Sequence, residues 1–434
     1  YAWSVGARAV HASRTSPAGP VHLNVPLREP LVPEPGALPS FEERRAAAID
    51  IPNPRPPNPA AVASLASELA ATERGLIVSG PQDDPDLPAA LTRLAAVTGY
   101  PVLADPLSLV RFGPHDRSLV VDAYDAFLRN ARLAAELRPE VVLRIGDTPI
   151  SKPLLEHLAG HRGAHQVLLP GDAPWNDPDF VARTALLGDA RLACVALADA
   201  AEAHRARGAG PWAARWRAID ARAGEALDSW LADLGEPFDG RAVADLASLL
   251  PDGATLVAGN SMPVRDLDAF VRGSSRAIRP LANRGASGID GVVSTALGAS
   301  ASGAPLALAI GDVSFIHDLG GLLAARAHRL RATILLLHND GGGIFSFLPV
   351  ARHGESFERL FGTPHGLDLS AVRDLFGIAF ERTTSAEEAR ASLAAALERD
   401  GVTVVEVRTD RGRNVVLHRE AWAAVSRAVA AVPA

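Results

Sequence analysis

The chain has 434 residues, of which 48% are hydrophobic and 21% are charged, which are ordinary proportions for a globular protein of two to three domains. Its formal net charge of −7 excludes the basic footprint that is typical of nucleic-acid-binding proteins. Its single cysteine, Cys194, excludes an internal disulfide framework and a multi-cysteine metal site, so we expect a cytoplasmic protein. No apolar run is long enough to span a membrane.

The first part of the chain reads as the last helix and strand of a domain, followed by a linker. Residues 1–13 read as a helix with one apolar face and no capping residue before it. Residues 20–25 (PVHLNV) alternate between apolar and polar side chains, which predicts a strand. The proline-rich residues 26–59 predict a linker between domains. We therefore expect a chain cut from a longer one, with residues 1–35 as the remnant of a preceding domain.

Helical and strand patterns alternate through the middle of the chain. The expected helices are residues 60–71, 87–98, 124–137 and 152–158, and the expected strands are residues 75–79, 101–104, 140–145 and 166–169. Such alternation is typical of a doubly wound parallel sheet with helices on both faces. A helical connection that contains Trp212, Trp216 and Trp230 follows. We assign residues 36–235, linkers included, to a middle domain.

The same alternation restarts at Gly240. The expected helices are residues 241–250 and 289–300, and the expected strands are residues 255–258, 305–310, 333–337 and 402–407. The sequence therefore predicts the α/β class, with successive doubly wound parallel-sheet domains, of which the last covers residues 236–434.

Two polar clusters follow neighbouring strands of this last domain. Asp312 comes directly after the strand PLALAI, and Asn339 follows the strand TILLL and is 27 positions further along the chain. That spacing leaves room for one helix and one strand, so both clusters lie at the carboxyl edge of the sheet, where open α/β folds bind ligands. A carboxylate, a side-chain amide oxygen and a backbone carbonyl are ligands that Mg²⁺ accepts, together with a phosphate. The glycines at 341–343 let the backbone turn sharply close to such a ligand.

Each cluster by itself has a simpler interpretation. Asp312 after a strand is typical of a helix N-cap, and residues 339–343 are typical of a tight turn. Their order and spacing together favour the metal site.

Longer motifs extend this pattern. The pair Gly311-Asp312 and Asn339 resembles the signature of thiamine-diphosphate enzymes, although Val313 replaces a glycine and the asparagine pair reads His338-Asn339-Asp340. The longer stretches that resemble one family are residues 283–291 (NRGASGIDG), 311–322 (GDVSFIHDLGGL), 339–349 (NDGGGIFSFLP) and 19–31 (GPVHLNVPLREPL). This family is 2-succinyl-5-enolpyruvyl-6-hydroxy-3-cyclohexene-1-carboxylate synthase, of menaquinone biosynthesis.

The resemblance implies the thiamine-diphosphate-enzyme fold and a transferase reaction. The family decarboxylates 2-oxoglutarate on thiamine diphosphate and Mg²⁺, or Mn²⁺, and adds the succinyl unit to isochorismate in a conjugate addition. Its members consist of pyrimidine-binding, middle and diphosphate-binding domains, and their active sites form between the subunits of a homodimer or homotetramer. Residues 1–35 resemble only the end of the pyrimidine-binding domain. We therefore assign the catalytic glutamate of that domain to no residue, and we expect this chain by itself to be inactive.

The resemblance also assigns roles to residues inside its motifs. The expected metal ligands are Asp312, Asn339 and the carbonyl of Gly341, and the further residues expected against the cofactor are Ser261, Met262, Ile289 and Ser314. Ile289 would bend the cofactor, and Ser314 would lie near its diphosphate. The expected substrate-binding residues are Arg265, Arg284, Ile344, Phe345, Leu348 and Lys152. A guanidinium matches the carboxylates that both substrates carry. Outside these motifs, the same arginines would be taken as solvated and the apolar residues as core.

Two other functions compete with this interpretation. Another thiamine-diphosphate enzyme, such as an acetolactate synthase or a 2-oxo acid decarboxylase, would keep the fold and the metal site but not the roles of the arginines. A non-catalytic nucleotide-binding module would also have a doubly wound sheet, but the chain contains no G-x-G-x-x-G between a strand and a helix.

Overall fold

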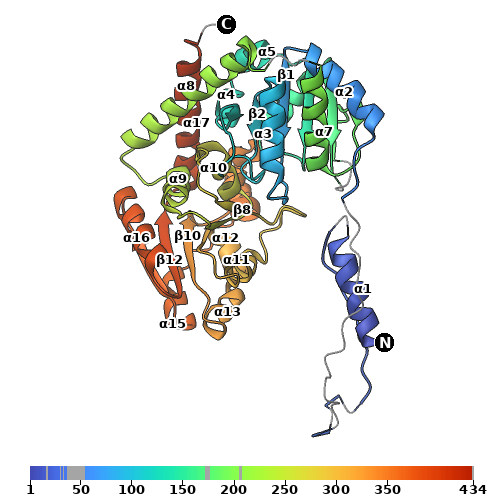
Figure 1. Cartoon of the computed structure of the whole chain (residues 1–434). Helices are drawn as coiled ribbons and strands as arrows, with labels where there is room; N and C mark the ends of the chain where they lie inside the picture. The colour runs from blue at the N-terminus through green and yellow to red at the C-terminus, as the bar shows by residue number, and fades with distance from the viewer. Residues whose placement is uncertain are drawn as a thin grey trace.

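Two parallel six-stranded sheets carry the fold in the computed structural model, one in each half of the chain (Figure 1). The structure describes residues 1–15, 18–29, 31–32, 34–36, 54–171, 176–204 and 208–432. The predicted α/β class with successive doubly wound sheets is confirmed. Among the described residues, no helix combines the length and the apolar character that a bilayer-spanning segment needs.

The first sheet belongs to what we call the middle unit, residues 59–203. Its strand order is β3-β2-β1-β4-β5-β6, and its strands are β1 (Gly75–Ser79), β2 (Val102–Ala104), β3 (Val120–Val121), β4 (Val141–Ile145), β5 (His165–Leu169) and β6 (Thr184–Ala185). Its helices are α2 (Pro59–Ala71), α3 (Leu87–Thr98), α4 (Tyr124–Phe127), α5 (Ala131–Glu136), α6 (Lys152–Gly160) and α7 (Ala190–Ala203). Side chains alternate across β1, so that Ile77 packs into one core and Leu76 and Val78 into the other.

The second sheet belongs to the C-terminal unit, residues 239–429, and has the order β11-β12-β10-β9-β7-β8. Its strands are β7 (Thr255–Ala258), β8 (Arg279–Leu281), β9 (Leu306–Gly311), β10 (Ala332–His338), β11 (Ala379–Thr383) and β12 (Val402–Arg408). The helices α9 (Asp239–Leu249), α10 (Met262–Phe270) and α16 (Ala386–Glu398) cover one face. The helices α11 (Val292–Ser300), α12 (Asp312–His317), α13 (Leu322–Ala327) and α15 (Val372–Phe376) cover the other.

A series of short helical turns lies between β10 and α15 in the chain. These turns are η2 (Gly343–Phe347), η3 (Pro349–His353), α14 (Gly354–Phe357), η4 (Glu358–Gly362) and η5 (Leu369–Ala371), and a similar turn, η1 (Leu319–Gly321), follows α12.

The two sheet units share one core. The helices α8 (Pro211–Asp233) and α17 (Arg411–Val429) pack against each other, and side chains such as Trp216 and Leu417 bury themselves in the same cluster as strand residues of the middle unit. In Figure 1, α17 accordingly extends from the C-terminal unit to the side of α8.

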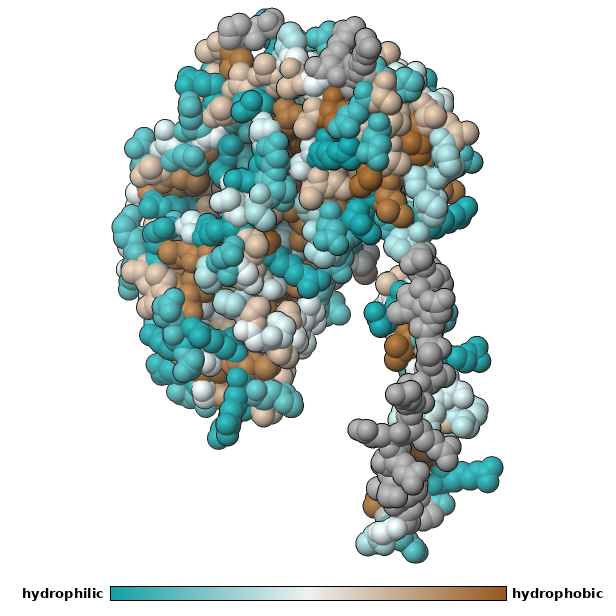
Figure 2. Space-filling view, in the orientation of Figure 1, coloured by the Kyte–Doolittle hydropathy of each residue, from teal (hydrophilic) through white to brown (hydrophobic). Residues whose placement is uncertain are grey.

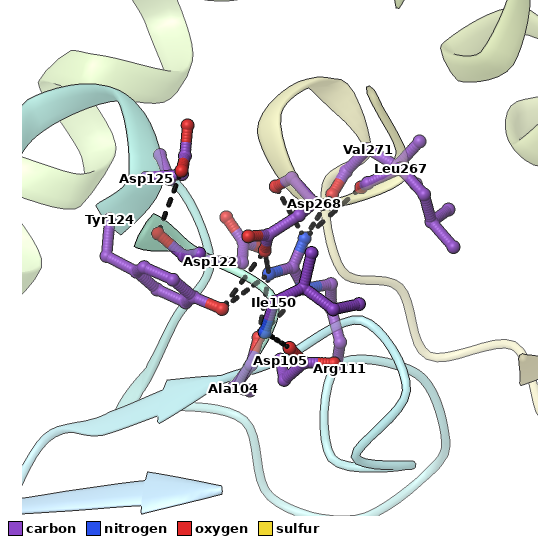
Figure 3. A network of polar contacts seen from close by, with 12 residues as sticks. Ala104, Asp105, Arg111, Asp122, Tyr124, Asp125, Ile150, Leu267, Asp268 and Val271 are labelled. Atoms are coloured by element: carbon purple, nitrogen blue, oxygen red, sulfur yellow. Dashed lines mark hydrogen bonds and ion pairs between the residues drawn. The ribbon is translucent and has the colours of Figure 1, made fainter. Parts of the chain in front are cut away.

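A buried arginine joins the two units (Figure 3). Arg111 of the middle unit has no exposed surface, and its Nη2 donates to Oδ1 of Asp268 at 2.6 Å. Its Nη1 donates to the carbonyls of Asp268 and Val271, at 2.9 and 3.2 Å, at the end of α10. The last carbonyls of a helix have no partner inside the helix, so the guanidinium supplies their missing donors. Tyr124 adds a hydrogen bond to the same carboxylate oxygen at 3.0 Å.

Two sequence predictions about local structure were wrong. Residues 20–25 form no strand, because an alternating segment becomes a strand only when a neighbouring strand accepts its hydrogen bonds, and no described strand pairs with it. The expected helix over residues 124–137 is two helices, α4 and α5. Asn130 separates them, because its side chain accepts from the backbone N–H of Leu133 and so starts a new helix.

The N-terminal helix α1 (Ala2–Arg14) buries none of its residues, and it lies apart from the two sheet units in Figure 1. Brown, apolar side chains are visible on this part of the chain in Figure 2. The large apolar side chains exposed in this part are Tyr1, Trp3, Val10, Val21, Leu23, Val25, Leu27, Leu31 and Val32. Most of the predicted linker between residues 26 and 59 lies outside the described residues.

Candidate functional site

Three neighbouring strands of the C-terminal unit end at one edge of the sheet, and each is followed by polar residues. Asn260 and Ser261 follow β7, Asp312 follows β9, and Asn339 follows β10. These residues line a single cavity of about 440 Å³. The cavity lies at the carboxyl ends of β7 and β9, which is the topological switch point of the sheet, because β8 and β9 lie on opposite sides of β7. Open α/β folds bind ligands at such points.

Asp312 is the buried carboxylate at the base of this cavity, with 1% of its surface exposed. Its Oδ2 accepts from the backbone N–H groups of Asn339 and Gly341, both at 3.1 Å. Its Oδ1 accepts from the N–H of Val313 at 2.7 Å. Three backbone donors hold this carboxylate in one orientation. Hydrogen bonds of this kind between backbone N–H groups and a carboxylate are strong, so the orientation is fixed.

The glycine loop after β10 is pressed against another part of the chain. Gly341 has a φ of +140°, and a Cβ there would lie 2.0 Å from the carbonyl oxygen of Gly362. The N–H of Gly342 donates to that same carbonyl at 2.8 Å. Only glycine allows both this backbone conformation and this close approach. The loop therefore depends on residues that lie about 20 positions further along the chain.

The oxygen atoms at this loop fit a hard cation. Oδ1 of Asn339 is buried and has no hydrogen-bond partner among the described residues. The carbonyl of Gly341 accepts one hydrogen bond, from the N–H of Gly343 at 2.9 Å, and keeps a second lone pair. With Asp312, these are the oxygen donors that Mg²⁺ prefers in proteins, and a buried amide oxygen without a partner is costly unless a ligand satisfies it.

Two histidines lie behind Asp312. Nε2 of His365 is 3.3 Å and Nε2 of His338 is 3.9 Å from its Oδ2, and the three side chains are close enough to hold a metal themselves. However, Nδ1 of His365 accepts from the N–H of Leu367 at 3.1 Å, so the proton of the neutral ring is on Nε2. His365 therefore directs an N–H, not a lone pair, at Asp312. Nε2 of His365 is buried and has no hydrogen-bond partner among the described residues, so its proximity to Asp312 is electrostatic, and with its lone pair on Nδ1 it is not oriented to share a metal with that carboxylate.

Two arginines face the cavity without an acidic partner. Among the described residues, Arg265 and Arg284 hydrogen-bond to a carbonyl and an amide oxygen, and neither forms an ion pair with a carboxylate within 4 Å. Arg265 donates to the carbonyl of Ser261 at 2.5 Å, and Arg284 donates to Oδ1 of Asn260 at 2.6 Å. Burial lowers the pKa of Arg265, and the positive charge of Arg284 lowers it further. Two neighbouring guanidinium groups that repel each other are suited to an anionic ligand.

The helix α10 begins at this cavity with a strained residue. Ser261 has a φ of 73°, which a side chain other than glycine adopts rarely, and Met262 and Pro263 start the helix directly after it. Such strain costs on the order of 1–3 kcal/mol and is concentrated at functional sites. On the opposite side, Oγ of Ser314 donates to the carbonyl of Ile289 at 2.6 Å, which ties the loop of Ile289 to α12.

Most of the residues chosen from the sequence meet at this cavity. Those that line it are Ser261, Met262, Arg265, Arg284, Ile289, Asp312, Ser314, Asn339, Gly341, Ile344 and Phe345. Leu348 and Lys152 do not line it. Leu348 directly follows the 3₁₀ turn η2, and 48% of its surface is exposed. The predicted placement of Lys152 at the site does not hold in this structure, because its side chain is 83% exposed at the start of α6 and pairs with Glu156 at 3.4 Å.

Several lining residues were not identified from the sequence. These are Asp239, Asn260, Ser287, Leu360, Phe361 and Thr363, together with backbone positions of the glycine loop. Asn260 lies in the same motif as Ser261 and could have been included for that reason. Asp239 and residues 360–363 come from the start of α9 and from η4, and no local pattern connects them with the cavity.

Asp239 is the only one of these with a clearly altered ionisation. It is 1% exposed, and burial raises its pKa to about 7, with the charge of Asp266 acting in the same direction. Its carboxylate accepts hydrogen bonds from Thr409 at 2.7 Å and Asn414 at 3.0 Å.

Comparisons with known proteins agree with this site. The family described as "Thiamine pyrophosphate enzyme, C-terminal TPP binding domain" matches residues 274–407, which include Asp312, Asn339 and Gly341. A 2-succinyl-5-enolpyruvyl-6-hydroxy-3-cyclohexene-1-carboxylate synthase of Geobacillus thermodenitrificans is 46% identical over 432 residues, which are 99% of this chain and 73% of that protein. The synthase of the same name from Chloroflexus aurantiacus is 46% identical over 425 residues, which are 98% of this chain and 72% of that protein.

A solved structure supports the fold. The benzoylformate decarboxylase from Polynucleobacter necessarius superimposes with a TM-score of 0.63 at 16% identity, covering 94% of this chain and 73% of that one. At this identity the likeness concerns the fold alone. The sequence identity to the synthases, over nearly the whole chain, concerns the family. The chain therefore belongs to the 2-succinyl-5-enolpyruvyl-6-hydroxy-3-cyclohexene-1-carboxylate synthase family and is a thiamine-diphosphate-dependent enzyme of that type.

Proposed function

We propose that this chain binds Mg²⁺ and the diphosphate of thiamine diphosphate in the cavity, for the decarboxylation of 2-oxoglutarate and the conjugate addition of the succinyl unit to isochorismate in menaquinone biosynthesis. When bound, thiamine diphosphate supplies the nucleophilic carbon and the electron sink that a 2-oxo acid decarboxylation requires. The chain supplies the ligands, the shape of the cavity and the positive charge beside it.

One observation carries the metal part of the proposal. Oδ1 of Asn339 is buried and unpartnered at the same cavity to which Asp312 and the carbonyl of Gly341 belong. A hard cation with a diphosphate would satisfy all three oxygens, and the backbone donors on Asp312 keep its carboxylate in place for it.

The two arginines support the choice of substrates. Both 2-oxoglutarate and isochorismate carry carboxylates, and Arg265 and Arg284 lie at the cavity without a carboxylate partner among the described residues. A guanidinium binds a carboxylate through two parallel hydrogen bonds, which fixes its orientation. The half-buried Ile344 and the partly exposed Phe345 give the same cavity an apolar side.

Binding of a paramagnetic metal ion, Mn²⁺, tests the proposal that the cavity holds a divalent cation with thiamine diphosphate. Titration with Mn²⁺ in the presence of thiamine diphosphate, followed by the loss of the free Mn²⁺ signal in electron paramagnetic resonance, should give one site per chain. Asp312→Ala should weaken that binding at least 100-fold, because it removes the carboxylate ligand and leaves three backbone N–H groups without an acceptor. The control is Asp318→Asn, which removes a partly exposed carboxylate six residues away that accepts, among the described residues, from Ser294. Equal loss in both variants would contradict the assignment.

Carbon dioxide release tests the reaction. With thiamine diphosphate and Mg²⁺, we expect a version extended upstream to release carbon dioxide from 2-oxoglutarate in a manner that depends on isochorismate, and we expect this chain by itself to be inactive. The Geobacillus thermodenitrificans synthase serves as the reference for the assay. Release from pyruvate instead would favour the acetolactate-synthase type. The need for residues upstream of Tyr1 stays a prediction, which the assay tests by comparing this chain with a version extended upstream.

The proposal includes a homodimer or homotetramer. Apolar side chains remain exposed beside the cavity, among them Phe345 at 37%, Leu348 at 48% and Leu360 at 63%. Contact with a second subunit would remove this surface from water. Sedimentation equilibrium tests this part of the proposal, and a monomer at micromolar concentration with cofactor bound would contradict it.

A further inference from the structure

The side-chain amide of Asn339 has two ends that face different surroundings. Its Nδ2 points toward α9 and donates to Oδ2 of Asp239 at a long 3.5 Å, and it lies over Gly343, where a Cβ would be 2.9 Å from it. Its Oδ1 is buried and has no partner among the described residues. A rotation by 180° would exchange oxygen and nitrogen with almost no change in shape. Only one of the two orientations offers an oxygen to a cation.

Asp239 is itself held in place. It lies at the start of α9 with 1% of its surface exposed, and it accepts from Oγ1 of Thr409 at 2.7 Å and from Nδ2 of Asn414 at 3.0 Å. The N–H of Thr409 donates to the carbonyl of His338 at 3.0 Å, next to Asn339 in the chain. Both carboxyl oxygens already accept hydrogen bonds, Oδ1 from Thr409 and Oδ2 from Asn414, so the group presents acceptors toward Asn339 and favours an N–H over an oxygen at the position of Nδ2.

We propose that Asp239 is a positioning residue that keeps the amide of Asn339 in the orientation in which Oδ1 faces the metal. The inference rests on the proposed function, because it concerns the same cation. Rotation of the amide would bring its oxygen against the carboxylate of Asp239 and would direct two N–H groups at the cation. Without Asp239, no acceptor distinguishes the two orientations, and part of the protein would present the wrong end to the metal.

The support of Asp239 continues into the C-terminal helix. Asn414 and His418 are both buried on α17, and Nδ1 of His418 contacts the carbonyl of Asn414 at 2.8 Å. Nε2 of His418 contacts Oδ1 of Asp266 on α10 at 2.8 Å. Asp266 directly follows Arg265 in α10, so one buried polar chain connects Asn339, through Asp239, Asn414 and His418, with the helix that carries a cavity arginine. Asp239 is thereby positioned by elements on two sides of the site.

The test is the Mn²⁺ titration with thiamine diphosphate, which requires no turnover. Asp239→Ala should raise the dissociation constant of Mn²⁺ by roughly 10- to 100-fold, the usual effect of losing a partner that orients a metal ligand. The conservative Asp239→Asn should restore most of the affinity, because its amide oxygen accepts from Asn339 while its NH₂ group donates to Thr409. An unchanged dissociation constant in Asp239→Ala would overturn the proposal.

A second background separates positioning from a general structural effect. In Asn339→Asp, the metal ligand is a carboxylate with two oxygens, so its rotation no longer matters. Adding Asp239→Ala to this background should leave Mn²⁺ affinity unchanged or improve it, because a neighbouring negative charge is removed. An equal loss in both backgrounds would show that Asp239 acts through the fold and would overturn the proposal.

Two further variants complete the design. Asp220→Ala removes another buried carboxylate, which accepts from the N–H groups of Asp122 and Ala123, and it should lower stability without changing Mn²⁺ affinity. If Asp239→Ala does not fold, Asp239→Ser replaces it, since its hydroxyl is too short to reach Asn339. Absence of Mn²⁺ binding in the unmodified chain would contradict the proposed function, whereas binding that is indifferent to Asp239 would contradict only this inference.

Discussion

The backbone N–H of Gly341 donates to Oδ2 of Asp312 at 3.1 Å, and this hydrogen bond joins the ends of two neighbouring strands. Asp312 follows β9, whereas Gly341 lies in the loop after β10. Because the bond fixes the distance between them, the carboxylate and the loop carbonyl can act on one ligand. The loop reaches this position only because Gly341 adopts a φ of +140° beside the carbonyl of Gly362.

Gly341→Ala should therefore disrupt the site. A Cβ would meet the Gly362 oxygen at 2.0 Å in a backbone conformation that alanine avoids, so we expect a loss of roughly 1–3 kcal/mol in the free energy of unfolding and weaker Mn²⁺ binding. Chemical denaturation and the Mn²⁺ titration measure the two effects. Gly298→Ala is the control, since it lies in α11 with open space around the position and should be neutral or stabilising by about 0.5–1 kcal/mol. A similar outcome for both alanines would argue against the role of the loop.

Arg284→Ala should weaken the binding of carboxylate substrates while cofactor binding is retained. Its guanidinium has no acidic partner among the described residues, and a hydrogen bond between charged groups contributes about 1.5–3 kcal/mol, which is roughly 10- to 100-fold in affinity. Calorimetric titration with 2-oxoglutarate, with thiamine diphosphate and Mg²⁺ present, measures this. The control is Arg279→Ala, which removes the same charge from a nearby position in the chain. The side chain of Arg279 pairs with Asp83 on the surface, so this variant should bind 2-oxoglutarate as the unmodified chain does. The assignment fails if Arg284→Ala binds 2-oxoglutarate normally.

Arg111→Met should destabilise the contact between the two units. The variant leaves Asp268 buried without its positive partner and leaves the last carbonyls of α10 without donors, which typically costs about 3–5 kcal/mol. Denaturant unfolding gives the value, and the added Asp268→Leu should recover part of it because the unpaired charge is removed. Arg132→Met, which removes an exposed arginine, should change the midpoint little. A cost below about 1 kcal/mol for Arg111→Met would mean that the ion pair contributes little.

The stability of the chain should depend on pH through Asp220. Burial raises the pKa of Asp220 to about 7, the charge of Asp122 acts in the same direction, and Arg272 opposes both. Between the ordinary pKa of 3.8 and about 7, the folded chain holds a proton on this group that the unfolded chain has released. Stability from this group is therefore fully present below pH 4 and is lost as the pH rises to 7, at up to about 1.4 kcal/mol per pH unit.

Asp220→Asn should flatten this dependence, because the amide does not titrate. Unfolding free energies measured at intervals between pH 4 and pH 8 test the prediction. Asp233→Asn replaces an exposed aspartate at the end of the same helix and should leave the curve unchanged. Other buried carboxyls such as Asp239 keep part of the slope, so the prediction is wrong if the slope in Asp220→Asn equals that of the unmodified chain.

The sequence by itself determined the class of the fold and placed the two polar clusters of the candidate site, those of Asp312 and Asn339, at one edge of the sheet. Strands such as β9 and β10 are continuous apolar runs between turn residues, and Asp312 and Asn339 directly follow them, so local patterns were sufficient to place both at one sheet edge. The motifs around Ser261, Ile289 and Arg284 were local as well. The family resemblance placed these residues at one site, and all three line the same cavity in the structure.

Only the tertiary structure decided which distant residues complete the site. Asp239 meets Asn339 from 100 positions away, and Gly362 presses on the glycine loop from η4, although neither lies in a motif. The exposure of Lys152 and the failure of residues 20–25 to form a strand have the same origin. The neighbours of a side chain, and the partner that a strand needs for its hydrogen bonds, come from segments far apart in the chain. Contacts between such segments produce no hydrophobic periodicity in either sequence, so a local pattern cannot predict them.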